Sequence, residues 1–214
     1  MPLITLPITP PPACTLAIWQ IVESEEEMTA PLPHGEELQA EARRRFKAAG
    51  RRLEWLAVRR LMHQLGIASP IAYLPSGKPY LKEDERHISI SHTRGYAAVA
   101  ISGTNPIGLD IEQRTDKVLR VQHKFLSPEE RLFIPSGEGN VEALLVLWTA
   151  KEAMFKLVDR AGIDFADHFH LAPFTVAPAG ECTARETFTP ERRTFSLRYW
   201  VLPEFVMTLG EEVI

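Results

Sequence analysis

Cysteine is scarce in this sequence: Cys14 and Cys182 are the only two among 214 residues. They cannot build a disulfide framework, and they lack the CxxC spacing of a zinc site or of a thioredoxin-like redox centre. No apolar run approaches the roughly 18 residues that a membrane helix requires. The residues before Glu23 contain no Lys or Arg and are interrupted by prolines, which argues against a signal peptide. We therefore expect a cytoplasmic protein with no membrane partner.

A strong net charge is also absent, because 24 Lys and Arg stand against 28 Asp and Glu, for a formal charge of −4. A protein that coats nucleic acid would usually be basic throughout. The exception is the stretch 41–60, where eight Arg or Lys accompany two Glu. Such a stretch is usually a solvated helix face, and no aromatic stacking platform or groove-binding motif accompanies it. We therefore expect no nucleic-acid partner.

The composition is otherwise that of an ordinary globular protein, with 45% apolar and 24% charged residues. Hydrophobic patterns and turn residues in the first half predict a strand, two helices and three short strands. Gly50 and Gly66 stand where the two helices would end. The predicted elements are 15–22, 36–49, 51–65, 71–74, 87–91 and 96–102.

The second half repeats this order of elements. A strand at 107–112 is followed by helical segments at 127–133 and 141–160, and then by strand-like runs from 170 to 208. The first of these helices opens with SPEE, which offers an N-cap serine, a proline at the first helical position and a glutamate at the third. We therefore expect an α+β fold of two pseudo-symmetric α/β subdomains, residues 1–104 and 105–214. Each would hold a strand, helices and a three-stranded sheet.

Two pairs of charged residues could carry chemistry. Asp110 and Glu112 lie two apart on a predicted strand and so share one face, an arrangement of oxygen ligands that suits Mg²⁺. Taken alone, the pair is better explained as the polar outer face of a half-exposed strand. Glu152 and Lys156 lie four apart on the long predicted helix, where an ordinary surface ion pair explains them. Trp148, on an apolar face of that helix, is expected to be a core anchor.

Together, GLDIE at 108–112 and WTAKEAMFK at 148–156 resemble the signature of the 4′-phosphopantetheinyl transferases. That family's signature is G-[IVL]-D-[IVL]-E followed by W-x-x-K-E-[AS]-x-x-K. Two spaced motifs match in order, and both supply groups that phosphoryl transfer requires. The matching fixed positions are Gly108, Asp110, Glu112, Trp148, Lys151, Glu152, Ala153 and Lys156.

Further segments resemble the longer, Sfp-type members of the family. Together the similar segments run from 51 to 156, about half of the chain. Ser89 stands where the family usually has Asn, and the N-terminal basic residues that help to hold the nucleotide have no counterpart before Arg43. The similar segments are RRLEWLAVR at 51–59, SGKPY at 76–80, SISHT at 89–93 and FLSPEE at 125–130.

The resemblance implies a Mg²⁺-dependent enzyme that moves the 4′-phosphopantetheine arm of coenzyme A onto a serine of an apo acyl carrier protein or peptidyl carrier domain. Its carrier could belong to fatty-acid, polyketide or nonribosomal peptide biosynthesis. Asp110, Glu112 and Glu152 would hold the metal ion. Lys156 would stabilise the departing phosphate, and the general base would be Glu130, Glu152 or a metal-bound water. The site would lie in the cleft between the two halves of a monomer.

The resemblance also implies a binding site for coenzyme A. Arg51 and Lys78 would hold its 3′-phosphate, His92 would bind a phosphate oxygen, and Ser91 and Lys151 would contact the same molecule. Without the family, plainer interpretations apply: His92 is a satisfied turn histidine, and Lys78 is solvated in a turn.

Two other classes of function fit the same residues. One is a noncatalytic module that binds coenzyme A or a carrier protein. The other is a Mg²⁺-dependent phosphohydrolase that uses the same carboxylates. A magnesium-dependent loading assay separates the first from a transferase, and product release that needs the apo carrier protein excludes the second.

Overall fold

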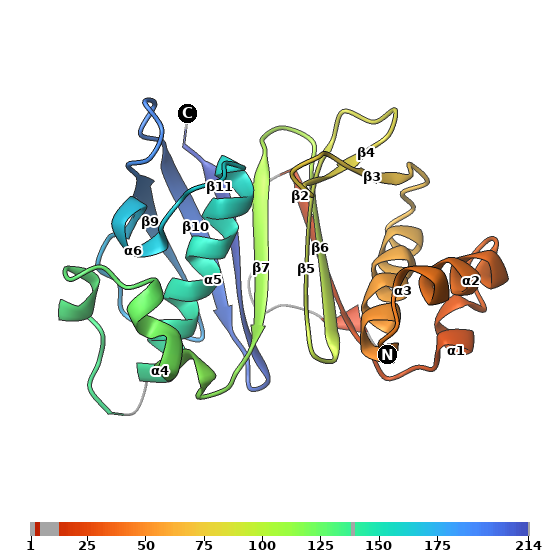
Figure 1. Ribbon diagram of the computed structural model, residues 1–214, viewed down its shortest axis with the longest axis horizontal. Coiled ribbons are helices and arrows are strands. Elements are labelled where there is room, and N and C mark those ends of the chain that lie inside the picture. The colour runs from red at the N-terminus through yellow and green to blue at the C-terminus, as the bar shows by residue number, and fades with distance from the viewer. Residues whose placement is uncertain (1–2, 5–12, 138–139, 214) are drawn as a thin grey trace.

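Helices and antiparallel sheets are both present in the computed structural model, which describes residues 3–4, 13–137 and 140–213 (Figure 1). The expectation of an α+β fold is confirmed. The main sheet of each half has more than the three strands expected. In each half the first long strand pairs into the sheet of its own half, whereas the strand expected at 71–74 lies in a separate two-stranded sheet. The four-stranded sheet has the order β1 (Leu3–Ile4), β2 (Cys14–Gln20), β6 (Tyr96–Ser102) and β5 (His87–Thr93). The five-stranded sheet has the order β7 (Ile107–Gln113), β11 (Phe205–Glu212), β10 (Thr194–Val201), β9 (Ala179–Glu186) and β8 (Phe169–Leu171).

Three helices accompany the four-stranded sheet: α1 (Glu25–Thr29), α2 (Gly35–Arg45) and α3 (Ala49–Gln64). The apolar face of α3 packs on the sheet in one core, to which Leu56 and Leu61 contribute fully buried side chains. The break between α2 and α3 lies at Phe46, whose backbone is extended, and not at Gly50 as expected. Gly50 lies in the first turn of α3, where a Cβ would meet nothing within 4 Å, so the turn does not depend on glycine.

A hairpin of β3 (Ile71–Tyr73) and β4 (Pro79–Leu81) follows α3 and carries the SGKPY segment. Its turn contains Gly77 at a φ of 90°, a left-handed conformation that glycine adopts without strain. The hairpin therefore projects Lys78 from a tight turn, because the glycine lets the chain reverse directly before it.

Helix α5 (Asn140–Val158) packs against β7 and β11 of the other sheet (Figure 1). Gly108 and Gly210 are paired in register on these two strands, directly beneath the helix. A Cβ at Gly108 would lie 2.0 Å from the carbonyl oxygen of Ala153, so only glycine permits this close approach. The glycine and the alanine of the two motifs thus bring the strand and the helix together.

The helix expected at 127–133 is a single 3-10 turn, Glu130–Leu132. Both reciprocal bonds of a capping box nevertheless form: the N–H of Glu130 donates to Ser127 Oγ, and the N–H of Ser127 donates to a carboxylate oxygen of Glu130. The carboxylate of Glu130 also binds a buried partner, described below. Short elements complete this half: α4 (Lys117–Val121), a 3-10 turn at Gln122–Lys124 and α6 (Phe165–His168).

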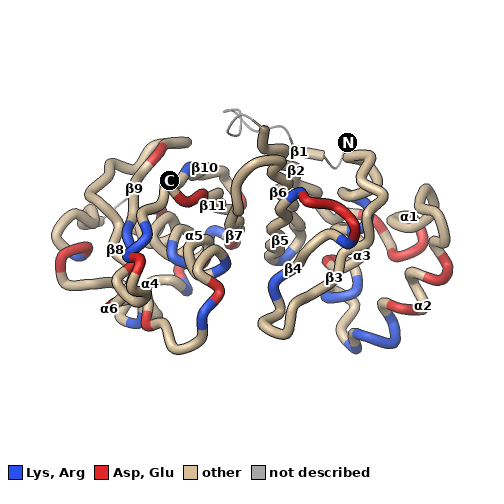
Figure 2. The backbone as a smooth tube through the Cα atoms, turned by 90° about the horizontal axis from the view of Figure 1, so that it is seen from above, with Lys and Arg blue, Asp and Glu red and all other residues tan. Residues whose placement is uncertain are grey.

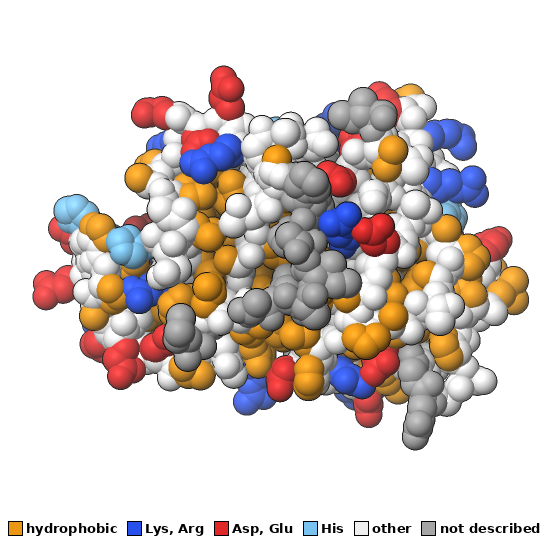
Figure 3. All heavy atoms as spheres, turned by 180° about the vertical axis from the view of Figure 1, so that it is seen from behind, with side chains coloured by type: hydrophobic (Ala, Val, Ile, Leu, Met, Phe, Trp, Pro, Cys, Tyr) orange, Lys and Arg blue, Asp and Glu red, His pale blue; other side chains and the backbone are white. Residues whose placement is uncertain are grey.

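A third core lies between the two sheets, with Ile18, Ala98 and Ala100 from the first sheet and Leu109 and Met207 from the second. Seen from above, β5 and β7 lie side by side at the centre of the molecule (Figure 2). On the back face, positive and negative side chains are interspersed and do not form a large patch of one sign (Figure 3). Among the helices of the described residues, none has both the length and the apolar character needed to cross a membrane.

Candidate active site

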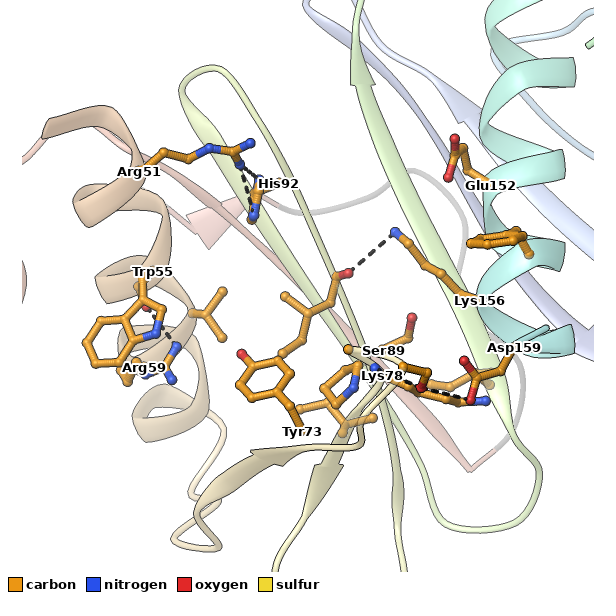
Figure 4. A pocket seen from close by; sticks show the side chains of 18 of the residues that line it. Arg51, Trp55, Arg59, Tyr73, Lys78, Ser89, His92, Glu152, Lys156 and Asp159 are labelled. Carbon is orange, nitrogen blue, oxygen red and sulfur yellow. Dashed lines mark hydrogen bonds between the residues drawn. The ribbon is translucent and has the colours of Figure 1, made fainter. Parts of the chain in front are cut away.

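A cavity of about 680 Å³ opens where elements of both halves face one another (Figure 4). Helix α3, the β3–β4 hairpin and β5 line it from one half, and the end of α5 lines it from the other. The structure brings several of the expected site residues together around this cavity. The expected site residues that line the cavity are Arg51, Lys78, His92, Glu152 and Lys156.

One face of α5 presents Trp148, Glu152 and Lys156 to β7, since residues four apart lie one above the other on a helix. The indole N–H of Trp148 donates to Glu112 Oε1 at 3.1 Å. Its ring also packs against that of Phe125, with centroids 5.2 Å apart. Trp148 is thus a packing anchor, as expected. It also orients the carboxylate of Glu112, which the family resemblance implies to be a metal ligand.

The ammonium of Lys156 sits between β5 and β7. It donates to the carbonyl oxygen of Leu109 at 2.6 Å, to Asp110 Oδ1 at 2.9 Å and, more weakly, to the carbonyl oxygen of Ile90 at 3.4 Å. Ser91 Oγ donates to the same Oδ1 at 2.8 Å. The other oxygen of this carboxylate, Asp110 Oδ2, is buried and has no hydrogen-bond partner among the described residues.

Three carboxylates therefore gather between β7 and α5. Burial and the charges of Asp110 and Glu112 raise the pKa of Glu152 to about 7, against the opposing effect of Lys156. Burial and the charge of Asp110 also raise the pKa of Glu112. The charges of neighbouring carboxylates thus contribute to the raised pKa of Glu112 and of Glu152. A bound cation would reduce this repulsion.

These residues fit Mg²⁺ in donor chemistry, since oxygen ligands are what the ion prefers and Asp110 Oδ2 is an unsatisfied buried oxygen. As the side chains lie, no three His, Cys, Asp or Glu side chains of the described ranges converge as a formed metal site. Asp110 would therefore hold an ion together with Glu112 and Glu152 only after the carboxylates of these two glutamates move toward it.

Across the cavity, His92 lies beside Arg51 (Figure 4), and Glu54 contacts both of them. A guanidinium nitrogen of Arg51 lies 3.2 Å from His92 Nδ1 and donates to Glu54 at 3.1 Å. Burial lowers the pKa of His92, and the charges of Arg51 and Lys156 lower it further, against the opposing effect of Glu54. The cluster brings a cationic group and an uncharged imidazole to one wall of the cavity.

The hairpin turn reaches over to the end of α5. Ser76 Oγ donates to Asp159 Oδ2 at 3.2 Å, which connects the two sides of the cavity at its edge. Lys78 lies beside this contact, where burial lowers its pKa and the charge of Asp159 partly compensates. A partly desolvated lysine facing a cavity is suited to bind an anion.

Five expected site residues do not line the cavity: Ser91, Asp110, Glu112, Glu130 and Lys151. Lys151 is fully buried and donates to Glu130 Oε2 at 2.6 Å and to the backbone carbonyls of Phe125 and Phe165. The second carboxylate oxygen of Glu130 accepts the N–H of Leu171 at 3.0 Å. The expectations that Lys151 contacts the cofactor and that Glu130 acts as general base do not fit this geometry, because each group's polar atoms are already bonded inside the core.

Ser91 departs from expectation as well. It is only 7% exposed and does not line the cavity, since its hydroxyl points to β7. The neighbouring Ser89 and His92 line the cavity instead.

Sequence reasoning missed an aromatic and basic wall of the cavity. The guanidinium of Arg59 lies 3.5 Å from the centroid of the Trp55 ring, and that of Arg45 lies 5.8 Å from it. Tyr73, exposed over 47% of its surface, completes the wall. The signal for Arg45 and Arg59 was the basic stretch 41–60, but its helical pattern alone does not distinguish a solvated face from one turned to a cavity.

Comparisons of the sequence with known proteins point to the same family that the two motifs resemble. Residues 106–210 match the family model described as the 4′-phosphopantetheinyl transferase superfamily. A segment of 91 residues is 34% identical to the Synechocystis sp. protein named "Putative 4′-phosphopantetheinyl transferase slr0495", and covers 39% of this chain and 37% of that one. A segment of 86 residues is 31% identical to the 4′-phosphopantetheinyl transferase gsp of Aneurinibacillus migulanus, and covers 39% of this chain and 35% of that one. The matched segments thus span little more than a third of either relative.

Proposed function

Because this chain belongs to the 4′-phosphopantetheinyl transferase superfamily, we propose that it transfers the phosphopantetheine arm of coenzyme A to a serine of an apo acyl carrier protein or peptidyl carrier domain. Adenosine 3′,5′-bisphosphate is the other product. The observation that carries the proposal is the gathering of Asp110, Glu112 and Glu152 beside Lys156 at the edge of a cavity lined with basic side chains.

The first task of such a site is to hold a pyrophosphate, whose charge repels an attacking hydroxyl. Arg51, Lys78 and His92 line one side of the cavity and support binding of the phosphates of coenzyme A there. The Arg45–Trp55–Arg59 stack offers a flat, cationic surface that suits a nucleobase. By resemblance to the family we assign Arg51 and Lys78 to the 3′-phosphate; both line the cavity from the half of the chain that does not carry the three carboxylates.

Asp110, Glu112 and Glu152 would hold Mg²⁺, which when bound neutralises the pyrophosphate and aligns its phosphorus. Lys156 contributes a positive charge at the same place and stabilises the departing phosphate. Its ammonium has to turn from the backbone carbonyl of Leu109 toward the ligand, a short movement because its side chain already borders the cavity.

A general base must accept the proton of the carrier serine. Of the two glutamates considered, Glu152 is the one that lines the cavity, so it is the better candidate beside a metal-bound water. Glu130 does not fit the role of general base, because its buried carboxylate is bonded to Lys151.

The chain's organisation supports an Sfp-type enzyme that acts as a monomer. Residues 1–104 and 105–214 each form a sheet of their own with a packed helix, and we propose that they are two related subdomains with the active site in the cleft between them. Both would contribute to one site, which a single chain can therefore complete.

Mass spectrometry of an apo carrier protein incubated with the protein, coenzyme A and Mg²⁺ tests the proposal. We expect the carrier serine to gain the phosphopantetheine group, with adenosine 3′,5′-bisphosphate released in equal amount. Release of that nucleotide without the carrier would indicate a phosphohydrolase instead. Binding of coenzyme A with no transfer in the presence of Mg²⁺ would indicate a noncatalytic module.

A further inference from the structure

Three hydroxyl side chains on one face of β5 accept hydrogen bonds from backbone N–H groups of β7. We call Ser89, Ser91 and Thr93 the hydroxyl ladder. Each partner lies 20 residues further along the chain, so the two strands run in the same direction with matching two-residue periods. The bonds are Leu109 N to Ser89 Oγ at 2.9 Å, Ile111 N to Ser91 Oγ at 3.3 Å and Gln113 N to Thr93 Oγ1 at 3.1 Å.

The hydroxyl ladder solves a hydrogen-bonding problem at the edge of the five-stranded sheet. Within the described residues, β7 pairs with β11 on one side and has no strand partner on the other. Leu109 and Ile111 are 0% and 1% exposed, so water does not reach the outward N–H groups readily. A buried N–H without a partner is strongly unfavourable. Side-chain hydroxyls of β5 therefore replace the backbone carbonyls that a neighbouring strand would supply.

Ser91 differs from the other two members because it also donates. A serine hydroxyl has one hydrogen and two lone pairs, so it can accept from Ile111 N while donating to Asp110 Oδ1. Lys156 Nζ binds that same oxygen. Ser91 and Lys156 thus both bind Oδ1 of Asp110. Oδ2 of Asp110 has no hydrogen-bond partner among the described residues.

We propose that Ser91 is a positioning residue for Asp110: it fixes the carboxylate with Oδ2 free to bind a cation, and it holds β5 and its neighbouring His92 beside β7. The cation part of this inference rests on the proposed function. The hydroxyl ladder itself does not, since it rests on the hydrogen bonds between β5 hydroxyls and β7 N–H groups alone. Ser91 does not border the cavity, so it acts through Asp110 and not by touching the substrate.

The test compares two variants that each remove one ladder hydroxyl. Ser91→Ala removes the bond to β7 and the bond to Asp110, whereas Thr93→Val removes a ladder bond only, with almost no change in side-chain shape. Ser91→Thr keeps a hydroxyl and should restore what Ser91→Ala loses. Two measurements are made on each ligand-free protein: amide hydrogen exchange of β7, and binding of Mn²⁺ as a probe of the cation site by electron paramagnetic resonance.

We expect the amide of Ile111 to exchange about tenfold faster in Ser91→Ala, and that of Gln113 about tenfold faster in Thr93→Val. Mn²⁺ should bind at least about fivefold more weakly to Ser91→Ala and within about twofold of wild type to Thr93→Val. If Mn²⁺ binding weakened equally in Ser91→Ala and Thr93→Val, Ser91 would have a structural role only. Unchanged Mn²⁺ binding in Ser91→Ala would overturn the positioning role. Unchanged amide exchange would overturn the hydroxyl ladder.

The two proposals fail in different ways. A wild-type protein that binds no Mn²⁺ would overturn the cation role of Ser91 and the metal site together, while amide exchange would still decide on the hydroxyl ladder. A protein that binds Mn²⁺ as described but does not load any carrier protein would contradict the proposed transfer and leave the positioning of Asp110 in place.

Discussion

Gly108 of β7 lies directly beneath Ala153 of α5, so that a Cβ on the glycine would stand 2.0 Å from the alanine's carbonyl oxygen. Both are fixed positions of the two motifs, yet neither carries a reactive group. Their contact sets the distance between the strand that bears Asp110 and the helix that bears Glu152. The small residues of the motifs therefore act by packing, and the charged ones depend on them for their positions.

Gly108→Ala should destabilise the protein by roughly 3 kcal/mol or more, because the added methyl group meets backbone that cannot move aside without shifting α5. Gly50→Ala is the matched control. It adds the same methyl group in the first turn of α3, where nothing lies within 4 Å, and should be neutral or slightly stabilising. Urea denaturation followed by circular dichroism measures both. Equal stability of Gly108→Ala and wild type would show that α5 does not depend on this contact.

Lys151→Met should cost about 3 to 5 kcal/mol of stability, because it leaves the carboxylate of Glu130 buried without its charged partner. Adding Glu130→Gln should recover part of that loss, since the uncompensated charge is then removed. Lys156→Met also leaves a buried carboxylate, Asp110, without its ion pair, but Lys156 is 30% exposed and borders the cavity, so this variant should lose less stability and should lose turnover. Thermal unfolding and carrier loading, measured together, separate the two lysines. If Lys151→Met were stable but inactive, the structural role of Lys151 would be contradicted and a role in the active site supported.

Lys78→Ala should reduce kcat/KM for coenzyme A more than for dephospho-coenzyme A, if the lysine binds the 3′-phosphate as proposed. A charge-assisted bond in a partly desolvated place contributes about 1.5 to 3 kcal/mol, which corresponds to roughly ten- to hundredfold in kcat/KM. Both substrates are measured on both proteins, which closes a cycle with the ligand as one partner. If the ratio between the substrates does not change, Lys78 does not recognise that phosphate.

Glu152→Gln should stabilise the metal-free protein at alkaline pH. The pKa of Glu152 is about 7 in the folded protein, above its ordinary value of 4.5, so the folded state binds this proton more tightly than the unfolded chain. The stability that results is complete below about pH 4.5 and is lost as the pH rises through 7. At pH 8 in a chelator the variant should therefore exceed wild type by up to about 3 kcal/mol, at roughly 1.4 kcal/mol per pKa unit.

The control for this pH dependence is Glu85→Gln, an exposed loop position that should leave the stability curve unchanged. Chemical denaturation at pH 4.5, 6, 7 and 8 gives both curves. The difference between wild type and Glu152→Gln should grow across this range. A difference that is constant with pH would mean that the carboxylate is not destabilised by its surroundings.

Much of the secondary structure could be predicted from local patterns. The β-like run YAAVAIS and the alternating faces of IGLDIE predicted β6 and β7, and the long apolar helix predicted at 141–160 is α5. One predicted helix did not form at its expected length. The SPEE segment forms both bonds of a capping box, yet only one 3-10 turn follows, and the carboxylate of Glu130 also binds Lys151, 21 residues away.

The sequence by itself determined which groups are candidates for chemistry: two spaced motifs, three carboxylates and a lysine that resemble the signature of one family. Only the tertiary structure decided which charged groups share the cavity. Lys151 and Glu152 are neighbours in the chain, yet one is buried in an ion pair and the other faces β7. Helical period fixes the angle between two side chains, but which face is buried depends on what packs against it, and those partners lie far away in sequence.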